Sequence, residues 1–253
     1  MKVNDIRSLT LASVFAAVIL VMTFVPQLGY ITIGTVALTL IHIPVLIGAF
    51  LLRKPYALVL AFIFGIGSLI RAATTPTGPL DPAFVNPLVS VLPRLLFALA
   101  AVYLVDLFKL FEKKVKNSHI YIFAVVTLIT SLGIYYAGQA IIQFSGWNST
   151  LVTLLFLVIN VAFVSGYYAF IQKGDTKILI PSTFIIATFI HTVLVLSAVV
   201  IFENDLIRSL VPSGNLMSLI FTIAISNGLV EAILAAFVGT PIVIAINQLE
   251  NQR

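Results

Sequence analysis

Arg94 is the most informative of the few polar residues that interrupt the long apolar stretches of this sequence. Asn86, Ser90 and Arg94 are spaced four residues apart, so on a helix they would lie on one face. A guanidinium group beside a hydroxyl and an amide can bind a carboxylate or a phosphate through paired hydrogen bonds. We therefore predict that this face binds an anionic ligand. The alternative is that Arg94 forms an internal ion pair with Glu231 or Asp81.

A second group of polar residues lies in the C-terminal third of the chain. Asn227 and Glu231 are four residues apart in one apolar stretch, and Thr188 and His191 share a helix face in another. An ionisable side chain inside a membrane must be paired, protonated or hydrated, so each is a candidate for a binding site. We predict that these four residues contact the ligand. For Glu231 the alternative is again a pair with Arg94, and for His191 it is a hydrogen-bonded place in the core.

Several other kinds of chemistry are excluded or disfavoured. The chain has no cysteine, which excludes a disulfide framework, a cysteine zinc site, an iron–sulfur cluster and a thiol nucleophile. The three histidines lack metal-ligand spacing, so we expect no metal and no cofactor, and we expect His42 to be structural. The sequence contains none of the common motifs for nucleotide binding, zinc peptidases or serine hydrolases. We expect no nucleic-acid partner.

Membrane-spanning helices must position these residues. Of the 253 residues, 60% are hydrophobic and only 9% are charged, whereas soluble domains have about 25% charged residues. A transmembrane helix needs roughly 20 apolar residues. We therefore predict an all-α polytopic membrane helix bundle in the lipid bilayer, with Pro93 bending the start of its fourth span. Eight segments are long and apolar enough: 8–26, 35–52, 56–72, 88–111, 120–144, 149–172, 178–202 and 216–247.

The basic residues are divided unevenly between the two sides of such a bundle. With eight spans, 11 of the 14 Lys and Arg fall on the side of the N-terminus, and the others are Arg71, Arg94 and Arg208. Positive charge accumulates on the cytoplasmic side, so we predict a multi-pass protein of the cell membrane with both termini in the cytoplasm. Arg71 is expected to extend to the lipid headgroups, and Asp106 and Lys109 are expected to pair along one helix.

Small residues form a stripe on the first span. Ala12 and Ala16 are four residues apart, and so are Ser13 and Ala17. Such spacing lets another transmembrane helix approach closely. The neighbouring helix could belong to a partner or to the same chain.

Several motifs resemble one family of membrane proteins. The second span contains LIHIPVLIGA (40–49) after Gly34 and Thr35, the third contains Phe64-Gly65 and Ser68-Leu69, and the fourth opens with NPLVSVLPR (86–94). Together with GTPI (239–242), these motifs are similar to the substrate-binding S components of energy-coupling factor (ECF) transporters, which import vitamins. The 86–94 motif is similar to the pantothenate-like members.

This resemblance implies a function, a set of partners and a site. The chain would be the high-affinity substrate-binding and translocation subunit of an ECF-type ABC importer for a vitamin, with pantothenate as the named candidate. It would not be an enzyme, and it would act with a transmembrane T subunit and two ATPase subunits. The resemblance implies that Ala12 and Ala16 dock on the T subunit. It also implies that the first outer loop and spans four, seven and eight enclose the vitamin.

One segment departs from the six helices usual in that family. We interpret residues 119–174 as an inserted transmembrane hairpin, with 1–118 and 175–253 forming the core that resembles S components. Two other functions compete with this interpretation. An intramembrane enzyme, such as a lipid-processing transferase, would need paired acids, a Ser/His pair or a metal cluster within the spans. A stand-alone secondary transporter often has repeated halves, and no convincing repeat is found.

Overall fold

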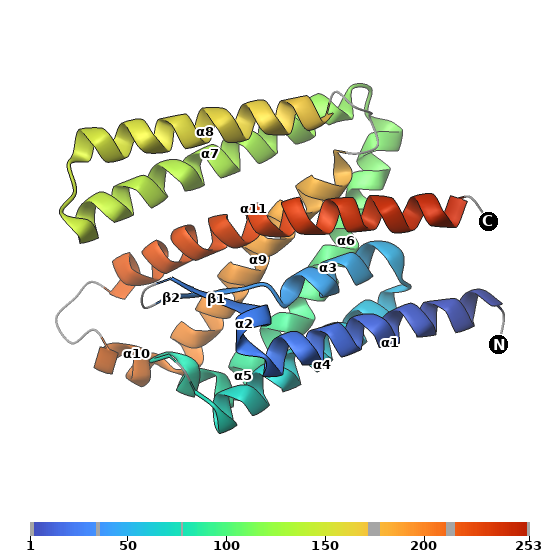
Figure 1. Cartoon of the computed structure of the whole chain (residues 1–253), viewed down its shortest axis with the longest axis horizontal. Helices are drawn as coiled ribbons and strands as arrows, with labels where there is room; N and C mark the ends of the chain where they lie inside the picture. The colour runs from blue at the N-terminus through green and yellow to red at the C-terminus, as the bar shows by residue number, and fades with distance from the viewer. Residues whose placement is uncertain (1–2, 34–35, 77, 172–177, 211–215, 252–253) are drawn as a thin grey trace.

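The fold is a bundle of long helices, as predicted for an all-α polytopic membrane protein (Figure 1). The computed structural model describes residues 3–33, 36–76, 78–171, 178–210 and 216–251. Within these residues, seven helices are long and apolar enough to cross a membrane. They belong to the elements α1 (Val3–Phe24), α4 (Lys54–Thr74), α5 and α6 (Pro87–Ser90 and Leu92–Lys114), α7 (Ser118–Ser145), α8 (Ser149–Ile171), α9 (Leu179–Phe202) and α11 (Leu216–Asn251).

The predicted second span, 35–52, is wrong as a single transmembrane helix. After the short helix α2 (Pro26–Gly29), strands β1 (Tyr30–Ile33) and β2 (Val36–Thr39) pair antiparallel, and α3 (His42–Leu51) follows. Tyr30 lies opposite Thr39 in this hairpin. The β-branched residues of 31–36 favour strands. Ten helical residues rise only about 15 Å, too little to cross a bilayer alone.

The hairpin and α3 nevertheless bring the chain back to the side from which it began. In Figure 1 they follow one another along the long axis, and both ends of the chain lie at the same end of the molecule. Short elements join the long helices at the opposite end: η1 (Asp81–Val85) and α10 (Asn204–Leu210).

The bend predicted at Pro93 is present and has a direct consequence for Arg94. Helix α5 ends at Ser90 and α6 begins at Leu92. Pro93 has no N–H with which to bond the carbonyl four residues earlier, and its ring crowds that carbonyl. The carbonyl of Val89 instead accepts a hydrogen bond from Nη1 of Arg94 at 2.6 Å. The proline therefore leaves a carbonyl available to Arg94 inside the bundle.

The main core fills the space between α1, α3, α4, α6, α9 and α11. Phe64, Phe97 and Phe184 are completely buried there, together with Leu46 and Leu60. The pair α7–α8 lies along one side of the bundle, beside α11 and α9 (Figure 1). Large apolar residues are exposed all over the outside, as a lipid-facing surface requires.

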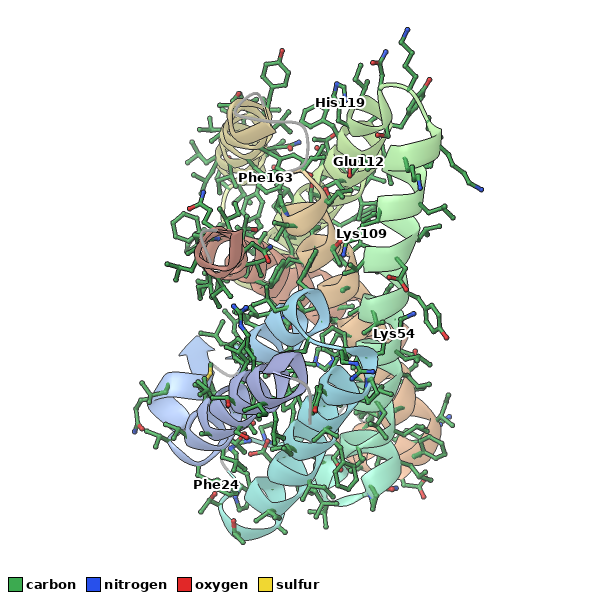
Figure 2. The ribbon with its side chains drawn as sticks, turned by 90° about the vertical axis from the view of Figure 1, so that its right-hand side faces the viewer. Phe24, Lys54, Lys109, Glu112, His119 and Phe163 are labelled. Atoms are coloured by element: carbon green, nitrogen blue, oxygen red, sulfur yellow. The ribbon has the colours of Figure 1, made fainter. Side chains whose placement is uncertain are left out.

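The predicted pair of Asp106 with Lys109 is wrong. Asp106 Oδ2 lies 2.6 Å from Nζ of Lys54, at the start of the neighbouring helix α4. The ammonium group of Lys54 also lies 5.0 Å from the ring centroid of Tyr103. Lys54 and Lys109 are seen along the same side of the molecule in the end-on view of Figure 2.

The prediction that Arg71 extends to the headgroups is also wrong. Its side chain is buried, and its guanidinium group lies 4.1 Å from the ring centroid of Tyr30 in β1. Its Nη2 lies 3.4 Å from Oδ2 of Asp81, which also accepts the backbone N–H of Gly78 at 3.0 Å. Arg71 therefore links the hairpin to the segment that follows α4.

Candidate functional site

Arg94 lies in the interior of the bundle, where Glu231 acts on its charge from beyond ion-pair distance. The residue is 5% exposed, and its guanidinium group lies 5.3 Å from the ring centroid of Phe64 and 5.0 Å from that of Phe84. Its Nε is buried without a hydrogen-bond partner. Among the described residues, no carboxylate forms an ion pair with Arg94. The predicted alternative, an internal pair with Glu231, is therefore present as a longer-range attraction and not as a direct contact.

Glu231 makes a direct contact with the β1–β2 hairpin. Its Oε1 accepts a hydrogen bond from the backbone N–H of Thr39 at 2.6 Å, and the residue is 6% exposed. This contact joins the end of β2 to the middle of α11. Asn227 lies one turn earlier on the same face and is partly buried. Glu231 therefore ties the hairpin to the bundle.

Two histidines form a stacked pair at the centre of the bundle. The rings of His42 and His191 have centroids 5.5 Å apart and planes inclined by 20°. His42, which we predicted to be structural, is completely buried, and its Nε2 lies 3.2 Å from Oγ1 of Thr188. The ring of Phe97 lies 4.7 Å from that of His191, whose Nδ1 has no hydrogen-bond partner among the described residues. Thr188 therefore orients His42, which in turn packs on His191.

Asn86 and Ser90 use their side chains to shape the turn before Arg94. Oδ1 of Asn86 accepts the N–H of Leu88 at 3.0 Å and so caps α5, while Nδ2 donates to Oε1 of Glu203 at 2.8 Å. The hydroxyl of Ser90 donates to the carbonyl of Asn86 at 3.0 Å. Of the three residues predicted on this face, Arg94 alone keeps a buried donor without a partner.

Ser68 is a candidate that the sequence reasoning did not single out. Its side chain is 5% exposed, and its hydroxyl has no partner among the described residues. It lies one turn after Phe64, whose ring faces both Arg94 and His191. The spacing of Phe64, Ser68 and Arg71 places them on one face of a helix and could have identified Ser68.

The arrangement offers polar groups that a ligand could pair with. Arg94 Nε, His191 Nδ1 and Ser68 Oγ are buried polar atoms with no described partner. Leaving such a group unpaired costs about 1–3 kcal/mol, so a ligand that pairs with it is favoured. No cluster of His, Cys, Asp or Glu that could hold a metal ion occurs among the residues that the structure describes.

The stripe of small residues on α1 is only partly available to another protein. Ala12 is 6% exposed, and Ala16 packs partly against the main core. Ser13 and Ala17 are exposed on the same helix. Ser13 and Ala17 are therefore more accessible to a partner helix than the predicted pair Ala12 and Ala16.

Two comparisons with known proteins agree with this description. The sequence model of the family "ECF transporter, substrate-specific component" matches residues 7–171. The pantothenate transporter PanT of Leuconostoc mesenteroides is 32% identical over 103 residues, which are 39% of this chain. The match covers half of that relative's length. Because the family match covers well over half of the sequence, the chain belongs to the family of substrate-specific components of ECF transporters.

Proposed function

We propose that the ligand is a vitamin with a carboxylate group, pantothenate in particular, and that Arg94 binds this carboxylate. The observation that carries the proposal is a buried guanidinium group whose Nε has no partner and which has no described carboxylate within ion-pair distance. Glu231 acts on it from farther away. Burying a charge without a partner costs several kcal/mol, whereas a carboxylate in the same space compensates it. The relative PanT is named as a pantothenate transporter, which supports the choice of vitamin.

The surrounding residues suit the rest of such a molecule. Pantothenate has an amide in its middle and two hydroxyl groups at the end opposite the carboxylate. His191 and Ser68 each have a buried polar atom without a described partner, and the Phe64 ring lies against both Arg94 and His191. We assign Arg94 to the carboxylate and His191, Ser68 and Asn227 to the amide and hydroxyl groups.

The remaining predicted residues support this site from outside. Asn86 and Ser90 hold the turn that presents Arg94, and Thr188 orients His42. Glu231 holds the β1–β2 hairpin through its hydrogen bond with Thr39. In this proposal the first outer loop, which contains the hairpin, covers the ligand.

Transport then requires partners, which we propose to be a T subunit and two ATPase subunits in the cell membrane, with both termini in the cytoplasm. Helix α1 would dock on the T subunit through the exposed pair Ser13 and Ala17. Ala17→Leu should abolish uptake and leave ligand binding intact, because a bulky side chain keeps helix backbones apart. Uptake that needs no partner subunit would contradict this part of the proposal and indicate a secondary transporter.

Isothermal titration of the purified chain with a panel of vitamins tests the ligand assignment. The panel should include acidic, neutral and cationic members. We expect pantothenate to bind with nanomolar affinity and the neutral and cationic vitamins to bind far more weakly. Tight binding of a neutral or cationic vitamin, with Arg94→Ala unaffected, would refute the assignment.

A further inference from the structure

The helices α7 and α8 form one unit along the side of the bundle (Figure 1). The hydroxyl of Ser131 in α7 donates to Oδ1 of Asn160 in α8 at 2.9 Å. Gly138 lets the two helices approach closely, because a Cβ atom there would lie 3.0 Å from Cγ of Phe156. A polar contact and a close backbone approach together hold the two helices as a pair.

Helix α7 packs where α9 and α11 meet. A Cβ atom at Gly133 would lie 3.3 Å from Cδ1 of Leu229 in α11 and 3.7 Å from Cζ of Phe189 in α9. Ile134 and Ala137 of α7 are buried with Leu229 in one apolar cluster, to which Phe189 also belongs. One segment of α7 therefore contacts both helices at once.

Helix α8 adds two contacts of its own. The hydroxyl groups of Tyr167 in α8 and Ser182 in α9 lie 2.6 Å apart, and both side chains are buried. Phe163 packs against the same cluster as Leu229 and also against a second cluster that includes Ala232 of α11. In the end-on view, Phe163 lies on the side of α8 that faces the rest of the bundle (Figure 2).

Helix α7 contacts α11 and α9 at Leu229 and Phe189, which point away from the candidate site. Leu229 is two residues from both Asn227 and Glu231, and Phe189 is two residues from His191. Side chains two residues apart on a helix point in nearly opposite directions, because each residue turns the helix by about 100°. Leu229 and Phe189, which contact α7, thus lie on the opposite faces of the helix turns that carry the candidate site residues.

We propose that the α7–α8 hairpin is a brace that fixes α9 against α11 from behind the site and thereby sets how long the ligand stays bound. The proposal rests on the proposed function and gives the hairpin a part in it. A site built on rigidly held elements loses less conformational freedom when the ligand binds. Loosening the two helices should therefore speed up dissociation of the ligand while the residues that contact it remain unchanged.

Three glycine variants test this idea with matched chemistry. The substitution Gly133→Leu places a bulky side chain between α7 and the α9–α11 pair. The control Gly166→Leu adds the same side chain where nothing lies within 4 Å. Gly133→Ala adds only a methyl group at the same place and is used if the leucine variant does not fold. Hydrogen exchange of the α9 and α11 amides is measured without ligand, and dissociation of radiolabelled pantothenate is measured separately.

We expect Gly133→Leu to speed up amide exchange in α9 and α11 and to raise the dissociation rate by about tenfold, with Gly133→Ala intermediate. Gly166→Leu should match the wild type. Leu229→Ala in the Gly133→Leu background should restore slow dissociation, because the smaller alanine leaves space for the introduced leucine side chain. The brace is refuted if folded Gly133 variants behave like Gly166→Leu in both measurements. If the wild type binds no pantothenate, the proposed function fails, while the exchange measurement still tests the brace.

Discussion

Two interiors of the same bundle are built in contrasting ways. Around Arg94 and His191, aromatic rings surround buried polar atoms that have no described partner. Between the α7–α8 hairpin and the bundle, apolar side chains such as Ile134, Leu229 and Phe189 interlock. Helices α9 and α11 contribute to both interiors. The contrast teaches that one side of these helices keeps buried polar atoms without a described partner, while the other side is closed by apolar packing.

The largest effect on ligand affinity is expected from removing the charge of Arg94. Arg94→Met should weaken pantothenate binding by a factor on the order of 10²–10³, because breaking a buried charge pair costs about 3–5 kcal/mol. Titration calorimetry measures the change, and the thermal melting curve shows whether the variant is folded. Lys54→Met removes a charge at the outside of the bundle and should bind normally. Equal losses of pantothenate affinity in Arg94→Met and Lys54→Met would contradict the contrast between the two interiors.

A smaller effect is expected from a hydroxyl that orients the histidine pair. Thr188→Val removes the contact with His42 and should lower affinity by about five- to tenfold, the worth of one hydrogen bond. Thr130→Val is the matched control, because among the described residues the buried hydroxyl of Thr130 bonds only carbonyls of its own helix, α7. If Thr130→Val lowered affinity as much as Thr188→Val, the histidine pair would have no special part in binding.

The hydroxyl of Tyr167 should contribute a still smaller amount, and to stability rather than to contact with the ligand. Tyr167→Phe removes the bond to Ser182 and should destabilise the fold by about 0.6 kcal/mol, the average for such bonds within membranes. The comparison is Tyr135→Phe, since Tyr135 is exposed on α7. The melting temperatures of both variants are compared. An unchanged value for Tyr167→Phe would mean that this bond does not hold the α7–α8 hairpin to α9.

The smallest effect is expected at the exposed ion pair. The side chains of Lys54 and Asp106 are 57% and 52% exposed, and pairs of this kind contribute little to stability. Asp106→Asn should leave melting temperature, affinity and uptake unchanged. A clear loss of uptake with normal binding would assign this pair to a contact with another subunit.

The long helices could be predicted from the sequence because each is a continuous apolar run bounded by polar or helix-breaking residues. The bend at Pro93 followed from the chemistry of proline alone. The β hairpin was missed because residues 30–39 are as apolar as a helix, and hydropathy does not distinguish a short strand from part of a span. The division into a core and an inserted hairpin at 119–174 stays a prediction, since the family match runs through residue 171.

The candidate site was predictable only in part. Spacing along a helix predicted Asn86, Ser90 and Arg94 on one face, but it could not show that the helix is broken after Ser90 and that the first two side chains are used in capping and local bonds. The contact of Glu231 with Thr39 joins residues far apart in the sequence, so no local pattern indicates it. Ser68 was overlooked because a single serine in an apolar helix is common.

The most direct test of the central claim pairs a change in Arg94 with a matching change in the ligand. Wild type and Arg94→Gln are each titrated with pantothenate and with the alcohol in which its carboxylate is replaced by CH₂OH. If Arg94 binds the carboxylate, the wild type should prefer the acid by a factor on the order of 10² or more, and Arg94→Gln should bind both equally weakly. A variant that still prefers the acid as strongly as the wild type would show that the carboxylate is bound elsewhere.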